Sequence, residues 1–298
     1  MPLHVVIAGA SGFLGSNLTA HLREHGHRVT RLVRRPAEGD DESTWDPRAK
    51  RYDERLIDDA DVVVNLAGSP TAGNPHSQKW ARELEESRVT TTRVLAQAIA
   101  AADEKPVFLA GNGISYYGDH GDAVVTEESD SRGDALLTRV TQVWQAAADP
   151  AVEAGARVCF LRTSPVMDRR SPPLKQMRLA WKLGLGARLG DGRQYFPMIS
   201  LRDWLGAVTF LAEHDTASGP FNLVVPQPPT NGEFTDALAR AVGRKAFLAA
   251  PKAALRLGAG EMAPELLGSL NAQPAALLAA GYEFHDHDVT EVLASALA

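Results

Sequence analysis

Three glycines near the start of the chain have the spacing of a phosphate-binding loop. Leu3–Ala8 is a short apolar run rich in β-branched residues, and Gly9, Gly12 and Gly15 follow it. A buried strand, a glycine-rich turn and a helix start, in that order, are typical of a dinucleotide-binding loop. Its first glycine permits the tight turn, its second lets the backbone approach a pyrophosphate, and its third lets helix and strand pack closely. We therefore expect the N–H groups at this helix N-terminus to bind a diphosphate rather than serve a structural turn alone.

Two arginines follow at the end of the next predicted strand, where a dinucleotide's ribose would lie. A cofactor without a 2′-phosphate usually meets an acidic residue about 20 residues beyond the loop. The sequence has Arg34 and Arg35 there, and its first nearby carboxylate is Glu38. A guanidinium suits a phosphate and can stack on adenine. We therefore predict NADP(H) as the cofactor, although most such arginine pairs are solvated surface residues.

The composition limits the classes of function that remain. With 298 residues and 44% hydrophobic residues, the chain is long enough for a large α/β domain and a second lobe. The formal net charge of −6 gives no general attraction to nucleic acid or to an anionic membrane. No apolar run approaches the roughly 20 residues of a membrane span. Because the N-terminus leads straight into a strand, without a basic region and an apolar segment, we expect no signal peptide. The single cysteine, Cys159, is expected to be a buried hydrophobe. These features predict a cytoplasmic protein.

Strands and helices alternate through the first half of the chain, which positions the loop and the arginines. Buried or half-buried strands are predicted at 27–34, near 44–45, and at 61–68, 106–111 and 156–163. Helices are predicted at 76–102 and 134–148. This order indicates a doubly wound parallel sheet with helices on both faces, an NAD(P)-binding Rossmann fold.

After Pro165 the alternation breaks, which indicates a second, smaller and mostly helical lobe. We assign residues 1–165 and 200–226 to the NADP-binding domain, and residues 166–199 and 227–298 to a lobe that covers the substrate. Phe221–Val225 is expected to return to the sheet as its last strand. The stretch His285–Asp288 contains two histidines, but Asp288 and Glu291 have the spacing of a helix N-cap. We therefore expect a helix start there, and no metal site.

Eight sequence motifs together resemble an atypical, extended short-chain dehydrogenase/reductase. They are GASGFLG at Gly9, VVVNLAG at Val62, SRVTTTRVL at Ser87, YYGDHGDAVVTEES at Tyr116, FLRTSPVM at Phe160, KLGLGARLGDGRQYF at Lys182, GPFNLVVPQPPTNGEF at Gly219 and GYEF at Gly281. The resemblance covers nearly the whole chain. Within this superfamily, the motifs most resemble the sugar-nucleotide-epimerase-like "epimerase family" branch. That branch includes bacterial proteins of unassigned substrate and a human counterpart.

This resemblance implies roles for individual residues at a cofactor. Gly9, Ser11, Gly12, Phe13 and Leu14 would surround the pyrophosphate, and Arg34 would bind the adenosine 2′-phosphate. Leu66 and Ala67 would flank the adenosine and the central ribose-phosphate. Glu83 and Arg88 match helix positions that face the cofactor, and Pro165 would lie near the nicotinamide. Without the resemblance, Arg88 would be interpreted as an exposed helix charge.

The catalytic residues usual in this superfamily are missing. Its members commonly use a tyrosine four residues before a lysine, which lowers the phenol's pKa, and a serine or threonine. Aligned by Trp144, the first two positions hold Leu136 and Val140, and the third holds Asn112. The branch as a whole lacks the Tyr/Lys pair. In addition, Ser200 stands where many relatives have a histidine that could act as an acid or base.

Few residues remain as candidates for proton transfer. Tyr117 and Tyr116 occupy the turn beside the substrate side of the cofactor, although core packing and cleft lining are the alternative role for this pair. Asn112 occupies the serine position. Asp191 and Arg193, in a glycine-rich stretch, could meet a charged substrate or form a solvated loop.

Two functions of different classes are therefore predicted. The first is an NADP(H)-binding oxidoreductase or sugar-nucleotide epimerase with a small-molecule substrate. The alternative is a non-catalytic NADPH-binding regulator or sensor. The sequence contains no basic patch that would indicate nucleic-acid binding. A homodimer through the long helix at 76–102 is possible by resemblance.

Overall fold

The computed structural model describes all 298 residues, and the chain forms two compact units. The first contains residues 1–112, 140–161 and 208–220, and the second contains residues 113–139, 162–207 and 221–298. Residues 113–139 belong to the second unit, which is slightly longer than the first, so the limits of the units differ from the domain boundaries expected from the sequence. The functional division into a cofactor domain and a substrate-covering lobe remains a prediction.

A seven-stranded sheet begins in the first unit with the order β11-β7-β5-β4-β1-β2-β3. Its strands are β1 (His4–Ala8), β2 (Arg28–Val33), β3 (Glu42–Thr44), β4 (Val62–Asn65), β5 (Val107–Gly113), β7 (Val158–Thr163) and β11 (Gly219–Leu223). The ladders from β5 through β4, β1 and β2 to β3 are parallel. The chain runs from β1 outward to β3 and then returns to β4 on the other side of β1. Ligands of open parallel sheets bind beyond the strand ends at such a reversal.

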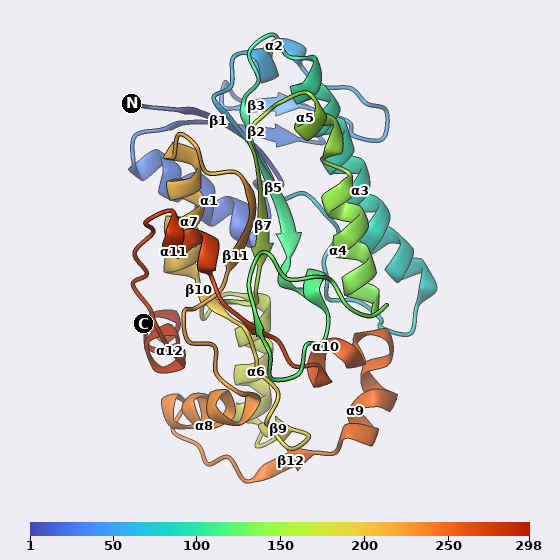
Figure 1. Ribbon diagram of the computed structural model, residues 1–298, viewed down its shortest axis with the longest axis vertical. Coiled ribbons are helices and arrows are strands. Elements are labelled where there is room, and N and C mark those ends of the chain that lie inside the picture. The colour runs from blue at the N-terminus through green and yellow to red at the C-terminus, as the bar shows by residue number, and fades with distance from the viewer. The chain divides into compact units, whose positions relative to one another are not determined.

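Helices lie on both faces of these strands, as predicted (Figure 1). They are α1 (Phe13–Glu24), α2 (Glu54–Asp58), α3 (Gln78–Ala101), α4 (Leu136–Ala146), α5 (Asp149–Glu153) and α7 (Leu201–Glu213). Val6, Ala8 and Val63 share one buried cluster with Leu95 and Ile99 of α3. The intervening β1 side chains point to the other face because successive residues of a strand alternate, and α1 lies on that face (Figure 1). The doubly wound fold class is therefore confirmed.

Short elements make up most of the second unit. Its helices are α6 (Pro172–Lys182), α8 (Asn231–Ala241), α9 (Lys252–Ala259), α10 (Ala263–Leu267), α11 (Ala275–Ala279) and α12 (Val289–Leu297), with 3-10 turns η1 (Ile114–Tyr117) and η2 (Gly260–Met262). Its short strands are β6 (Val124–Val125), β8 (Val166–Met167), β9 (Ala187–Leu189), β10 (Ile199–Ser200), β12 (Leu248–Ala250) and β13 (Asn271–Ala272). The predicted helix start at Asp288 is confirmed, since its carboxylate accepts the N–H groups of Thr290 and Glu291. None of the helices combines the length and apolar character needed to cross a bilayer.

Candidate functional site

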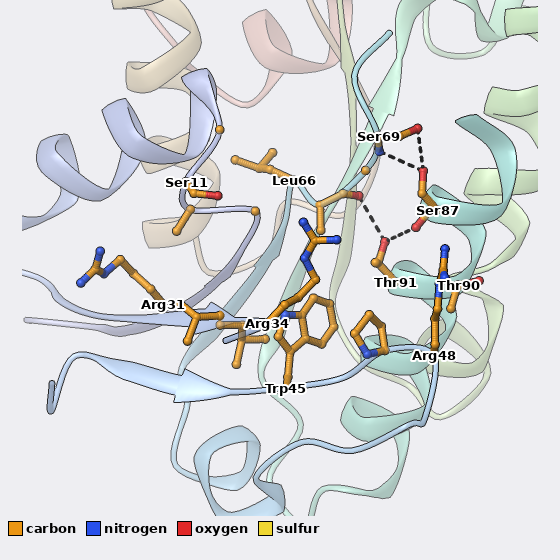
Figure 2. A pocket seen from close by; sticks show the side chains of 18 of the residues that line it. Ser11, Arg31, Arg34, Trp45, Arg48, Leu66, Ser69, Ser87, Thr90 and Thr91 are labelled. Carbon is orange, nitrogen blue, oxygen red and sulfur yellow. Dashed lines mark hydrogen bonds between the residues drawn. The ribbon is translucent and has the colours of Figure 1, made fainter. Parts of the chain in front are cut away.

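A cleft of about 850 Å³ opens in the first unit at the carboxyl ends of β1, β2 and β4 (Figure 2). Five segments line the cleft: the glycine loop, the end of β2, the stretch after β3, the turn after β4 and the helix α3. Among the predicted site residues, those lining the cleft are Gly9, Ser11, Gly12, Arg34, Arg35, Leu66, Ala67 and Glu83.

The glycine loop has the conformation that its spacing predicts. Gly9 has a φ of +84°, and a Cβ there would lie 2.6 Å from the carbonyl carbon of Leu66. A Cβ on Gly15 would lie 2.2 Å from the Gly9 carbonyl oxygen, so α1 packs against the loop only because this residue is glycine. The tight turn at Gly9 and the close packing at Gly15 are therefore confirmed.

The N-terminus of α1 is open toward the cleft. Gly12 is its N-cap residue, and no side chain accepts the N–H groups of the first turn. Those groups and the helix dipole together favour an anion. Phe13, Leu14 and Gly15, which follow in the first turn, are not among the residues that line the cleft, and their contact with a cofactor remains a prediction.

The arginines at the end of β2 differ in what they already bind. Arg35 holds the carboxylate of Glu42 through two hydrogen bonds of 2.7 Å. Arg31 pairs with the same carboxylate and with Asp41 at 3.0 Å. The Arg35 guanidinium keeps the pKa of Glu42 below its usual range. Arg34 has no intramolecular ion pair or side-chain hydrogen bond, so its guanidinium is free to receive a ligand.

Side-chain hydrogen bonds hold the turn after β4 in place. Asn65 accepts the N–H of Ala67 at 3.0 Å and donates to the hydroxyl of Thr92 at 2.8 Å. The hydroxyl of Thr91 donates to the Ala67 carbonyl (Figure 2). These bonds hold Leu66 and Ala67 against the cleft, where the sequence placed them.

Arg88 lies behind the cleft lining rather than in it. Its guanidinium donates to the carbonyl oxygens of Ser69 and Leu84 at 3.1 and 3.0 Å, and stacks over Trp144 at 5.2 Å from the ring centroid. No carboxylate lies within ion-pair distance, and burial lowers the pKa of Arg88 to about 10. It is therefore not the exposed helix charge that its sequence pattern alone would indicate.

Sequence reasoning missed the stretch after β3. Trp45, Pro47 and Arg48 line the cleft, although only a short strand was predicted in this region. Trp45 is buried, and Arg48 is exposed. The aromatic residue and the proline within a polar stretch are a signal that could have marked a packed segment.

Tyr117, the predicted proton donor, is buried within the second unit. Its hydroxyl donates to the Asn222 side-chain oxygen at 2.7 Å and accepts from Arg162 at 2.6 Å. The Arg162 guanidinium also lies over the Tyr116 ring, 3.7 Å from its centroid. Burial raises the pKa of Tyr117 to about 12 despite the nearby guanidinium. Tyr116 is only partly buried.

The three positions that the resemblance assigns to the usual catalytic group hold Leu136, Val140 and Asn112. Leu136 and Val140 are 5% and 1% exposed. Asn112 is buried and donates from its amide to the Thr141 carbonyl at 3.2 Å. The Ser200 hydroxyl accepts the N–H of Asp203 at 3.2 Å, as an N-cap residue of α7 does.

The remaining candidates lie in the second unit. Pro165 follows β7, and its carbonyl accepts the N–H of Ile199. Asp191 pairs with Lys252 at 3.1 Å and accepts the N–H of Arg193, in an exposed loop. Cys159, in the first unit, is fully buried, as expected, and burial raises its pKa to about 11.

Comparison with known proteins decides the family. The profile of the NAD dependent epimerase/dehydratase family matches residues 5–223. The chain belongs to this family. Residues 250–296 of this family member also match a domain of unknown function, DUF1731.

Relatives within the epimerase family cover almost the whole chain. Epimerase family protein ML0860 of Mycobacterium leprae is 42% identical over 293 residues, which are 98% of this chain and 95% of the relative. The crystal structure of human epimerase family protein SDR39U1 with NADPH has a TM-score of 0.87 and 30% identity, covering 99% of both chains. A nucleoside-diphosphate sugar epimerase of Corynebacterium glutamicum has a TM-score of 0.80 and 33% identity, over 99% of this chain and 58% of the other. The resemblance inferred from the sequence is confirmed.

Proposed function

We propose that this protein binds NADP(H) in the cleft and acts as an oxidoreductase or epimerase on a small polar substrate. The observation that carries the proposal is the unpaired Arg34 guanidinium beside an uncapped helix N-terminus in one cleft. The two features match a 2′-phosphate and a diphosphate. The NADPH found in the crystal structure of the human relative supports this choice.

The charges around Arg34 favour the phosphorylated dinucleotide. A ribose without a 2′-phosphate is usually bound by a carboxylate near the end of β2. The carboxylate of Glu42 lies there, but Arg31 and Arg35 already hold it. Arg35 therefore serves to neutralise Glu42, while Arg34 is left to bind the phosphate.

The chain's own contribution to the chemistry is binding and orientation. NADP(H) supplies hydride transfer when bound. In the proposal the α1 amides hold the diphosphate, and Leu66 and Ala67 flank the adenosine. The desolvated charge of Arg88, which has no carboxylate partner, adds positive potential behind Ser69. Tyr117 and Asn112, the candidates for proton transfer, do not line the cleft.

A non-catalytic NADPH-binding regulator is the second candidate, and one observation favours it. The Tyr117 hydroxyl is fully buried and already makes two hydrogen bonds, so it is not available to a substrate. Leu136 and Val140 are aliphatic, so they provide no alternative proton donor at the usual positions. Oxidation of NADPH with any member of a panel of carbonyl compounds and sugar nucleotides would exclude this candidate.

Replacing Tyr117 with phenylalanine distinguishes a structural role of its hydroxyl from a catalytic one. The change leaves the Asn222 oxygen and one Arg162 N–H without their partner, and should destabilise the protein by about 1–3 kcal/mol. We expect NADPH affinity to stay the same, since Tyr117 is not a cleft residue. Chemical denaturation and fluorescence titration measure the two effects. Loss of turnover on an identified substrate, without loss of NADPH binding or stability, would instead make Tyr117 catalytic.

Replacing Arg34 with alanine tests the proposed cofactor. We expect NADPH affinity to fall by roughly 10- to 100-fold, because a charge-assisted bond to the 2′-phosphate is worth about 1.5–3 kcal/mol. The NADH affinity should change by less than about threefold, since a contact to the absent 2′-phosphate cannot be lost. Titration of both nucleotides, followed by calorimetry, gives the ratio of the two affinities. If wild-type protein bound NADH more tightly than NADPH, the cofactor choice would be wrong, and if it bound neither, the proposed function would fall.

A further inference from the structure

Four arginines of the segment 31–48 line the cleft, and only two of them are used within the protein. Arg31 and Arg35 are held by Asp41 and Glu42. Arg34 and Arg48 have no carboxylate partner, and their guanidinium groups make no hydrogen bond within the chain. The proposed function uses Arg34 alone, so Arg48 is an unexplained free cation of the cleft.

The backbone that carries Arg48 is fixed, although its side chain is free. The Asp46 carboxylate accepts the N–H groups of Arg48 and Ala49 at 3.0 and 3.1 Å. The backbone of Asp46 also exchanges two hydrogen bonds with Arg51, which closes the turn. Trp45, 3% exposed, anchors the segment to the core. Arg48 is therefore presented to the cleft from a defined position.

The cleft that Arg48 lines has apolar as well as charged walls. In the view of Figure 2 the side chains of Arg34 and Arg48 point in the same direction, and both residues line the cleft. Among the residues that line the cleft, Trp45, Pro47, Leu66 and Ala67 have apolar side chains. A guanidinium is planar and weakly hydrated, and it stacks on aromatic faces.

We infer that Arg48 is a base-recognition residue that stacks on the adenine ring of the bound nucleotide. This inference rests on the proposed function and extends it, because it assigns the two free guanidinium groups to different parts of one ligand. Arg34 binds the 2′-phosphate, and Arg48 covers the purine against the Trp45 segment. The predicted contact depends on the planar guanidinium of Arg48 and not on its charge alone.

Two nucleotides that differ only in the 2′-phosphate test the inference. Adenosine 5′-monophosphate and adenosine 2′,5′-bisphosphate are titrated by calorimetry at fixed ionic strength into wild-type protein and its variants. Arg48→Ala should weaken both ligands by the same factor, about three- to tenfold, as expected for loss of a cation–π contact. Arg48→Lys should not restore the affinity, because a compact hydrated ammonium does not stack in the same way. Arg34→Ala should show the opposite pattern, with the loss confined to the bisphosphate.

Arg55→Ala is the matched control, since Arg55 is exposed on α2 nearby and lies outside the cleft. It removes the same charge and should leave both affinities within twofold. A loss in Arg48→Ala confined to the bisphosphate, or restored by lysine, would make Arg48 a phosphate ligand and overturn the inference. Unchanged affinity in Arg48→Ala would overturn it as well. Failure of wild-type protein to bind the bisphosphate or NADPH would instead remove the proposed function, and this inference with it.

Discussion

Replacing Gly9 with alanine is expected to abolish NADPH binding, with a loss of affinity of at least about 100-fold. Alanine at a φ of +84° is strained by about 1–2 kcal/mol. Its Cβ would also lie 2.6–2.7 Å from the backbone of Leu66 and Ala67, and backbone cannot rotate away. Either the turn opens or β4 moves, and both displace the amides that face the diphosphate. Overpacking of this kind adds about 1–3 kcal/mol of destabilisation.

Gly26 provides a matched control for that substitution. It also has a φ of +84°, but nothing lies within 4 Å of the position its Cβ would take. Gly26→Ala therefore carries the same backbone strain without the collision, and should lower stability by about 1–2 kcal/mol while NADPH affinity stays within twofold. Thermal denaturation and nucleotide titration of both variants are the measurement. Equal NADPH affinity in the two variants would show that the close approach of Gly9 to β4 is not needed for binding.

The sequence predicted the part of the site that is built from consecutive residues. An apolar run, a glycine turn and an amphipathic helix are local signals, and they placed β1, the turn at Gly9 and the start of α1 correctly. The end of β2 was also placed to within one residue. The resemblance of the motifs to a known family then predicted that Leu66 and Ala67 face the cofactor, and both residues line the cleft.

What the sequence could not give depends on pairing between strands. Arg34 and Arg35 are equivalent in the sequence, yet only Arg35 binds Glu42. That choice follows from the β2–β3 register, in which Arg31 pairs with Glu42 and Val33 with Thr44. Arg48 lies in a polar stretch with no periodicity, and its place in the cleft follows from the turn that Asp46 closes. Neither interaction leaves a repeating pattern that could be recognised from residue types.

The same limit applies to residues inferred from alignment alone. Tyr117 was identified by its place in a turn, which says nothing about whether its hydroxyl is exposed. Its environment is set by Asn222 and Arg162, more than 40 residues away in sequence. A tyrosine can therefore occupy the expected place in the sequence while its hydroxyl is buried and already hydrogen-bonded, which is why Tyr117 is tested by substitution rather than assumed catalytic.

Asp203 is the residue whose loss should affect the second unit most. Its side chain is 1% exposed and accepts hydrogen bonds on both oxygens. One oxygen accepts the Tyr282 hydroxyl at 3.1 Å and the His285 N–H at 2.8 Å. The other accepts the Asp286 N–H at 2.8 Å and the Ser200 hydroxyl at 3.3 Å. Burial raises the pKa of Tyr282, so its hydroxyl stays protonated and remains a donor. One carboxylate thus joins the start of α7 to residues 282–286.

Asp203→Asn is therefore expected to destabilise the second unit by about 3–5 kcal/mol, because a buried carboxylate is replaced by a group that accepts on one side only. The new amide N–H₂ must face an N–H or hydroxyl donor, which leaves buried donors unpaired. Since two units need not unfold together, hydrogen exchange of the amides at 282–287 is the direct measurement, with chemical denaturation beside it. Asp288→Asn makes the same chemical change at a half-buried N-cap, where asparagine caps as well as aspartate, and should cost less than about 0.5 kcal/mol. Equal protection at 282–287 in the two variants would show that the Asp203 carboxylate does not hold this segment.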